Sequence, residues 1–441
     1  MRPRLSTADL GRWVDPAHAW NALCRDAPAA FWLDSGPHAT SGMSYLGVAA
    51  ETTTRFDGPV LDWLRAQVGD GALDGDAPPG FRLGWVGWLG YELRSETMGT
   101  PRTRRSRYPD SAWLRVDHCL AFDHARGTVS VLSLGDADAE RDRILVALLA
   151  AGPTSSPFPP EPPAAPHRVE WAYPDADYLD MVAACQEAIA RGDAYQLCLT
   201  TEARVGVSPD PFTTYLAVRE ASPTHHGALL VTESVAVLCA SPEQFLAVSP
   251  DGVVTTSPIK GTRRRGDDPR ADELLRLELE SSDKERAENL MIVDLMRNDL
   301  SRICRVGSVG VTSLLAVESY AQVHQLVSTV RGELAPGLTG IDAIDACFPA
   351  GSMTGAPKHS ATLILDALER RARGIYSGVL GYVGRDGAVD LAMVIRSIVI
   401  DETGSTVGTG GGITALSLPD EELAETRLKA RALLEILGAR A

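Results

Sequence analysis

A proline-rich stretch most constrains how this sequence folds. Residues 151–168 contain seven prolines among Gly, Ser, Thr and Ala, with no hydrophobic period. Such a composition favours extended, polyproline-like backbone and cannot build a packed core. We therefore expect a linker or surface loop over 151–168, an N-terminal region over 1–150 and a larger region over 169–441.

The composition excludes several classes of protein. The 441 residues carry 42 Lys and Arg against 58 Asp and Glu, a net charge of −16. Nucleic-acid binding needs a basic surface, so we expect no nucleic-acid partner. No run reaches about 18 apolar residues and no signal-peptide pattern is present, so we expect no membrane association. The seven cysteines form no C-x-x-C pair, which favours reduced thiols in a cytoplasmic protein.

Helical and strand patterns alternate irregularly along the chain, without an internal repeat. Apolar residues at helical spacing predict helices over 137–151, 175–191, 272–300, 360–371 and 419–437. Alternating or continuous apolar runs predict strands over 129–134, 195–205, 235–240, 245–248, 377–383, 389–400 and 405–409. Irregular alternation of this kind indicates an α+β fold rather than a regular βαβ array.

Two of the predicted helices carry glutamates three residues apart. Glu285 and Glu288 form one pair, and Glu422 and Glu425 form the other. Residues at i and i+3 share a helical face, so each pair can point toward one ion. Mg²⁺ prefers hard oxygen ligands and leaves positions open for substrate oxygens, so two such pairs can hold Mg²⁺ over an anionic substrate. On spacing alone, two solvated helix faces are the more common interpretation.

A glycine-rich stretch and an isolated arginine indicate a site for a small anion. Gly410, Gly411 and Gly412 follow a predicted strand, where their N–H groups can approach a ligand closely. A flexible turn is the alternative. Arg396 lies in the apolar run 393–400, where a guanidinium requires a carboxylate or phosphate partner.

Several longer motifs, taken in order, resemble those of the chorismate-utilising enzymes, the family of anthranilate synthase component I. The resemblance extends from about residue 173 to 437, with a weaker match at FWLDS, 31–35. The motifs are SPEQF at 241–245, PIKGTRRRG at 258–266, KERAENLMIVDLMRNDLSRI at 284–303, FPAGSMTGAPK at 348–358, GVLGYVG at 378–384, IRS at 395–397 and GTGGGI at 408–413.

The resemblance implies an α/β sandwich of two large, mainly antiparallel β-sheets with helices outside, and with chorismate and Mg²⁺ between the sheets. It assigns the four glutamates to the metal. It assigns the general acid to Glu243, because the C4 hydroxyl of chorismate is a poor leaving group and needs a proton. It assigns substrate binding to Thr262, Thr354, Tyr382, Arg396, Gly410, Gly411, Gly412 and Lys429.

Two positions distinguish the reactions within the family. Members that use water carry lysine where this chain has Gln196, so the resemblance implies ammonia as the incoming group. Members that form anthranilate carry alanine where this chain has Lys260. An amine that attacks C2 of the ring forms an adduct, and ammonia can then add at C4 and expel the lysine. We therefore expect chorismate and ammonia to give 4-amino-4-deoxychorismate, the precursor of 4-aminobenzoate and folate.

The remaining expectations concern one histidine and the source of ammonia. The family often has histidine at the position of Gln325, and we expect the preceding His324 to take its catalytic role. No cysteine lies in a nucleophile-like motif, so ammonia is expected from a separate glutaminase subunit or from free ammonium. The alternatives are amination at C2 to give anthranilate and, from another class, an inactive scaffold that binds a glutaminase.

Overall fold

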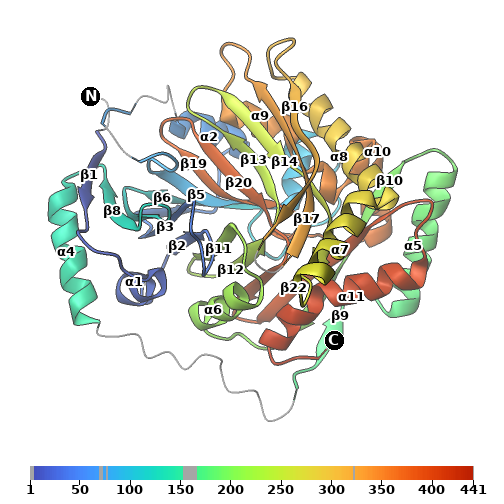
Figure 1. Ribbon diagram of the computed structural model, residues 1–441, viewed down its shortest axis with the longest axis horizontal. Helices are drawn as coiled ribbons and strands as arrows, with labels where there is room; N and C mark the ends of the chain where they lie inside the picture. The colour runs from blue at the N-terminus through green and yellow to red at the C-terminus, as the bar shows by residue number, and fades with distance from the viewer. Residues whose placement is uncertain (1–3, 69–72, 76–77, 152–165, 321–322, 441) are drawn as a thin grey trace.

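Two large β-sheets form the centre of the structure (Figure 1). The computed structural model describes residues 4–68, 73–75, 78–151, 166–320 and 323–440. Over these ranges one sheet has 12 strands and the other 10, and the paired strands run antiparallel. The predicted α+β sandwich of two antiparallel sheets is confirmed. Residues 152–165 lie outside the described residues, so the linker over 151–168 stays a prediction.

The first sheet contains strands from both ends of the chain. Its order is β1 (Ser6–Asp9), β8 (Thr128–Ser133), β7 (His118–Asp123), β3 (Met43–Val48), β2 (Ala30–Asp34), β11 (His226–Val231), β12 (Ala236–Ser241), β21 (Ser397–Asp401), β22 (Gly404–Ile413), β10 (Gln196–Val205) and β18 (Gly355–Ala356), with β9 (Val169–Trp171) paired to β10.

The second sheet is built in the same way. Its order is β15 (Ile259–Arg264), β17 (Val323–Glu333), β14 (Val253–Ser257), β13 (Gln244–Val248), β20 (Val389–Met393), β19 (Val379–Gly384), β5 (Gly84–Leu89), β6 (Ser111–Val116) and β4 (Glu51–Thr53), with β16 (Gly310–Ser319) paired to β17. Strands from 1–150 therefore join both sheets.

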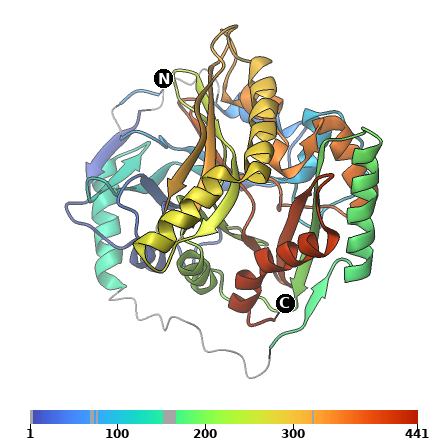
Figure 2. The same ribbon diagram turned by 45° about the vertical axis from the view of Figure 1, so that its right-hand side comes forward.

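The helices cover the outer faces of the sheets (Figures 1 and 2). Beside the second sheet lie α2 (Val60–Val68), α7 (Pro269–Ser281), α8 (Asp283–Ser301) and α9 (Gly340–Cys347). Packed on the first sheet are α1 (Pro16–Leu23), α4 (Ala137–Ala150), α5 (Asp175–Ala190), α6 (Pro211–Ala221), α10 (Lys358–Glu369) and α11 (Pro419–Ile436). Three short helical turns complete the set: η1 (Tyr91–Leu93), α3 (Arg94–Thr97) and η2 (Gly351–Met353).

Strand β5 explains why the inner strands are apolar on both faces. Trp85 and Leu89 belong to the core between the second sheet and its helices, whereas Val86 and Trp88 belong to the core between the two sheets. Because successive side chains of a strand point to opposite faces, a strand with a core on each side must be apolar at every position.

Three predicted elements differ from the structure near the cavity described below. The predicted helix over 272–300 is two helices, because Ser282 ends α7 and its hydroxyl accepts a hydrogen bond from the Glu285 N–H at 3.5 Å. The predicted strand over 389–400 is two strands, separated at Arg396, which has φ +50°. The glycines at 410–412 lie inside β22 rather than in a turn after it.

No helix within the described ranges is long and apolar enough to cross a membrane.

The two faces of α8 provide a test of the core. Leu300 is fully buried among apolar side chains, whereas Leu290 on the same helix is 44% exposed. We expect L300A to lower the free energy of unfolding by about 2–5 kcal/mol, because the substitution leaves a cavity. The matched control L290A should change it by less than roughly 0.5 kcal/mol. Denaturant unfolding followed by circular dichroism measures both, and equal losses would contradict the buried face.

Candidate active site

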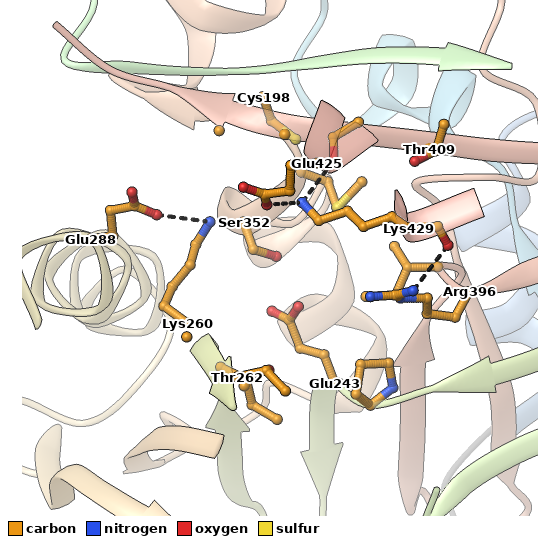
Figure 3. Close-up of a pocket in the computed structure, with 18 of the residues that line it drawn as sticks. Cys198, Glu243, Lys260, Thr262, Glu288, Ser352, Arg396, Thr409, Glu425 and Lys429 are labelled. Carbon is orange, nitrogen blue, oxygen red and sulfur yellow. Dashed lines mark hydrogen bonds and ion pairs between the residues drawn. The ribbon is translucent and has the colours of Figure 1, made fainter. Parts of the chain in front are cut away.

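A cavity of about 490 Å³ gathers most of the residues selected from the sequence (Figure 3). The selected residues come from six parts of its wall: the β12–β13 connection, β15, α8, the β20–β21 connection, β22 and α11. The predicted residues that line it are Glu243, Lys260, Thr262, Glu285, Glu288, Arg396, Gly410, Gly411, Gly412, Glu422, Glu425 and Lys429. Segments far apart in sequence thus meet around one space.

The glutamates of α8 are partly neutralised by cations of β15. The Lys260 Nζ lies 3.8 Å from the Glu288 Oε2, and the Arg263 Nη1 lies 3.4 Å from the Glu285 Oε1. Burial raises the pKa of Glu288, and the charge of Lys260 opposes that rise. The pairing therefore offsets part of the cost of burying this carboxylate in its charged form.

The glutamates of α11 also have partners. The Lys429 Nζ lies 2.6 Å from the Glu425 Oε1, and the Ser417 hydroxyl donates to the Glu422 Oε1 at 2.7 Å. Burial acts to raise the pKa of Glu425, but Lys429, Lys284 and Lys260 together outweigh burial, so this pKa is lowered. Glu422 is buried, and its carboxylate lies against the glycine strand β22.

The donor set fits a hard divalent cation. Four carboxylates from two helices line the same cavity, and carboxylate oxygens are the ligands that Mg²⁺ prefers. In the part of the chain that the structure describes, no three His, Cys, Asp or Glu side chains already lie close enough to hold one ion. Each glutamate instead faces the cation or hydroxyl named above, so ligation would require side-chain rotation.

Glu243 is the buried acid of the cavity. It follows β12, and its carboxyl points into the open space (Figure 3). Burial raises its pKa to about 7, while the neighbouring Ser352 hydroxyl and the Lys260 charge act in the opposite direction. A carboxyl with this pKa is substantially protonated near neutrality, so it can donate a proton.

Other groups approach the glycines of β22 closely. A Cβ at Gly410 would lie 2.3 Å from the Leu199 carbonyl oxygen, a backbone atom that cannot rotate away. A Cβ at Gly411 would lie 2.9 Å from the Glu422 Oε2, and a Cβ at Gly412 would lie 2.3 Å from the Gln196 Nε2. The same Gly412 Cβ would lie 3.6 Å from the Lys260 Nζ. Gln196 itself does not line the cavity. It is buried behind Gly412, and its Oε1 has no hydrogen-bond partner among the described residues.

Arg396 and Lys429 place two positive charges on the same wall. The Arg396 Nη1 donates to the Lys429 carbonyl at 2.9 Å, and the Lys429 Nζ donates to the Gly410 carbonyl at 2.9 Å. Burial lowers the pKa of Arg396, so an anion beside it would stabilise its charged form. The wall is therefore suited to bind carboxylates.

The structure places Tyr382 away from this cavity, contrary to expectation. Its ring packs 4.8 Å from that of Phe81, between centroids, and lines a separate cavity of about 70 Å³. The cause is strand parity in β19, where Leu380 and Tyr382 face the core between the sheets. Tyr376, which precedes β19, lines the larger cavity instead.

His324 and Thr354 also lie outside the cavity. The His324 Nε2 lies 2.9 Å from the Asp272 Oδ1, on the face of β17 that packs against α7, and Gln325 lines the cavity in its place. The Thr354 hydroxyl donates to the Ala350 carbonyl at 3.0 Å, while the cavity is lined by the preceding Ser352 and Met353. Neighbouring side chains here point toward and away from the cavity, and a motif match does not predict which of them points inward.

Comparison with known proteins establishes the family. Residues 28–435 match the family of chorismate binding enzymes, and the chain belongs to that family. The structure of anthranilate synthase component I from Streptococcus pneumoniae TIGR4 superposes with a TM-score of 0.77 at 26% identity, covering 98% of this chain and 93% of that one. The shared fold is thus that of anthranilate synthase component I.

Two relatives with different names are similar over nearly the whole chain. An aminodeoxychorismate synthase of Streptomyces pristinaespiralis is 39% identical over 98% of this chain, which spans 65% of that relative's length. An anthranilate synthase component 1 of Streptomyces coelicolor is 36% identical over 96% of this chain and 86% of its own length.

The raised pKa of Glu243 predicts a pH-dependent stability. An ordinary glutamate pKa is 4.5 and that of Glu243 is about 7, so the native state retains a proton that the unfolded state loses in between. The wild type should therefore lose up to roughly 3 kcal/mol in free energy of unfolding, relative to E243Q, between pH 5 and 8. Chemical denaturation across this range measures the difference. The exposed control E233Q should leave the profile of the wild type unchanged, and a pH-independent gap for E243Q would refute the buried titration.

Proposed function

We propose that this chain aminates chorismate at C4 to give 4-amino-4-deoxychorismate, with Lys260 as a covalent nucleophile. The observation that carries the proposal is that the Lys260 amine shares a cavity with a buried acid, Glu243. Similarity to the aminodeoxychorismate synthase of S. pristinaespiralis over 98% of the chain supports it.

Chorismate carries two carboxylates, and the cavity offers separate groups for them. Arg396, Lys429 and the N–H groups of Gly410, Gly411 and Gly412 are proposed to bind carboxylate oxygen. Thr262 can donate a hydrogen bond from β15. Glu285, Glu288, Glu422 and Glu425 are proposed to hold Mg²⁺, which when bound would neutralise the ring carboxylate. Each negatively charged carboxylate of the substrate would then meet positive charge, one from the side chains and the other from Mg²⁺.

The first chemical step forms a bond between Lys260 and the ring. Lys260 first loses its proton to solvent and becomes a neutral amine. Its Nζ then attacks C2, the two ring double bonds shift toward C4, and the C4–O bond breaks. Glu243 gives its proton to the departing hydroxyl, which leaves as water. The products of this step are a C2–N adduct with a cationic nitrogen and an ionised Glu243.

The second step reverses the shift of the double bonds. Ammonia attacks C4, the double bonds return to their first positions, and the C2–N bond breaks to release Lys260 as a neutral amine. The new C4 ammonium then returns a proton to Glu243, so the sum is chorismate and ammonia giving the C4 amine and water.

The nitrogen is proposed to arrive as ammonia from a glutaminase subunit, with free ammonium as a substitute. Gln196 supports this choice of nucleophile over water. It is neutral and cannot act as a base toward water.

Anthranilate synthesis is the second candidate, and the 36% identity to the S. coelicolor enzyme favours it. Direct addition of ammonia at C2 would give that product without a lysine adduct. Lys260 separates the two reactions, because its amine would attack the ring carbon that ammonia would otherwise attack.

The product and the role of Lys260 can be tested together. Purified protein with chorismate, Mg²⁺ and ammonium should give 4-amino-4-deoxychorismate by chromatography with mass detection. K260A should lose this product because no adduct can form, and K260R should lose it too because charge alone does not replace the nucleophile. Fluorescent anthranilate as the wild-type product would reject C4 amination, and full activity of K260A would reject the covalent step.

The proposed Mg²⁺ ligands predict which substitution weakens turnover at low Mg²⁺ concentrations. E422Q removes one anionic ligand from α11, so we expect the Mg²⁺ concentration for half-maximal rate to rise by roughly 10-fold or more. The exposed neighbour E421Q is the matched control and should leave that concentration unchanged. Titration of Mg²⁺ into chelator-treated enzyme measures both. Full turnover of the wild type in excess chelator would contradict the assignment.

A further inference from the structure

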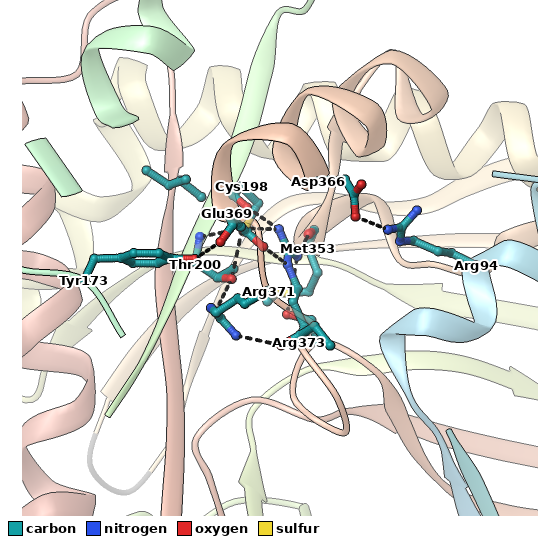
Figure 4. A network of polar contacts seen from close by, with 12 residues as sticks. Arg94, Tyr173, Cys198, Thr200, Met353, Asp366, Glu369, Arg371 and Arg373 are labelled. Atoms are coloured by element: carbon teal, nitrogen blue, oxygen red, sulfur yellow. Dashed lines mark hydrogen bonds and ion pairs between the residues drawn. The ribbon is translucent and has the colours of Figure 1, made fainter. Parts of the chain in front are cut away.

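A buried ion pair lies behind the cavity wall, and no step of the proposed reaction uses it (Figure 4). The Arg373 Nε donates to the Glu369 Oε2 at 2.9 Å, and the Nη2 donates to the Glu369 Oε1 at 2.7 Å. The two side chains are 1% and 2% exposed. Two charges this deeply buried are tolerated only where good geometry and further hydrogen bonds compensate for the lost water.

The remaining donors of Arg373 reach the backbone of two cavity walls. Nη1 donates to the Met353 carbonyl at 2.6 Å, and Nη2 donates to the Cys198 carbonyl at 2.9 Å. Met353 belongs to η2 and Cys198 to β10, and both line the cavity. Ser352, the residue before Met353, lies beside the Glu243 carboxyl. One planar side chain thus fixes the spacing of two walls.

Glu369 extends the same network along β10. Its Oε1 accepts hydrogen bonds from the Thr200 N–H at 2.9 Å and from the Thr200 hydroxyl at 3.0 Å. Cys198 and Thr200 pair in register with Gly412 and Gly410 of β22. The network therefore also holds the strand against which the glycine strand lies.

The N-terminal region holds the opposite side of Arg373. The Glu92 carboxylate accepts from the backbone N–H groups of Arg373 at 2.8 Å and Gly374 at 2.9 Å. The guanidinium carbon of Arg373 lies 4.3 Å from the centroid of the Tyr91 ring, a cation–π contact. The guanidinium is thus fixed in position as well as in charge.

We propose that Arg373 is a positioning residue for the amination reaction, acting through the Met353 and Cys198 carbonyls on the two walls that carry the acid and the glycine strand. The inference rests on the proposed function. Lysine cannot replace Arg373, because an ammonium has no planar fork that reaches a carboxylate and two carbonyls at once. A displacement of about 1 Å at such a site costs on the order of 10² in rate.

A nearby ion pair provides a matched control. Arg94 Nη2 donates to the Asp366 Oδ1 at 2.6 Å, and Asp366 precedes Glu369 by one turn of α10. Arg94 is also buried and lies 5.4 Å from the same Tyr91 ring. Among the described residues, its guanidinium donates to Thr100 and Asp366, neither of which lines the cavity. R94K therefore disturbs the same helix without touching the cavity walls.

The test compares R373K with R94K under conditions in which both remain folded by circular dichroism. Chorismate consumption by R373K should fall in kcat on the order of 10² while KM changes little, because Arg396 and Lys429 are untouched. R94K should keep the kcat of the wild type. Wild-type kcat in R373K, or equal losses in the two variants, would overturn the proposal.

Hydrogen exchange gives a readout that does not depend on turnover. In R373K the backbone amides of 352–354 and 198–200 should exchange faster than in the wild type, and in R94K they should not. A loss of kcat in R373K without faster exchange in these segments would also overturn the proposal. Consumption to a different product would refute the proposed function alone, since the comparison follows the loss of chorismate and not the product's identity.

Discussion

Four carboxylates that share one cavity repel each other unless cations lie among them, and this constraint organises the site. Lys260 and Arg263 bring positive charge from β15 to the glutamates of α8, and Lys429 does the same for Glu425 on α11. Removal of the cations would leave the glutamates with uncompensated negative charge in a partly buried space, and removal of the glutamates would leave the cations unpaired. The spacing of two helices and one strand is therefore set by charge as well as by packing.

Two of the groups that line the cavity lower the stability of the folded protein. Glu243 is buried at a cost that raises its pKa to about 7, and Arg396 takes a left-handed conformation with φ +50°. The buried carboxyl and the left-handed backbone each make folding less favourable, and each presents a functional group to the cavity. The large cores on both faces of each sheet supply the stability that tolerates them.

Local periodicity predicted the parts of the site that depend only on a helix. Glu285 with Glu288, and Glu422 with Glu425, share a helical face in any context, and all four line the cavity. Motif matching correctly selected Lys260 and Glu243 for the same space. It also selected Tyr382 and His324 for that space, but both side chains lie outside it, because the direction of a strand residue depends on which face meets which core. A one-residue difference reverses that direction, and only tertiary packing decides it.

Glycine chemistry explains a different kind of failure. The run at 410–412 was expected after the end of a strand, with a flexible turn as the alternative, yet it lies within β22. Glycine is unfavourable inside strands, so this position needs a tertiary reason. The reason is distant in sequence: a Cβ at Gly410 would lie 2.3 Å from the Leu199 carbonyl oxygen of the neighbouring strand β10. The break at Ser282 was missed for a similar reason, because a serine inside a helical pattern marks a boundary only when its hydroxyl caps the next helix.

The pairing of strands that are far apart in sequence affects how this protein folds during its synthesis. Strand β2 pairs with β11, and β5 pairs with β19, where Gly84 lies opposite Gly384. Loop closure over such separations is slow, because the chain must lose conformational entropy before the stabilising contacts form. During synthesis this edge of β5 stays unpaired until β19, roughly 300 residues later, has left the ribosome. Protection of nascent apolar strands is therefore a requirement of this topology, whatever reaction the finished enzyme performs.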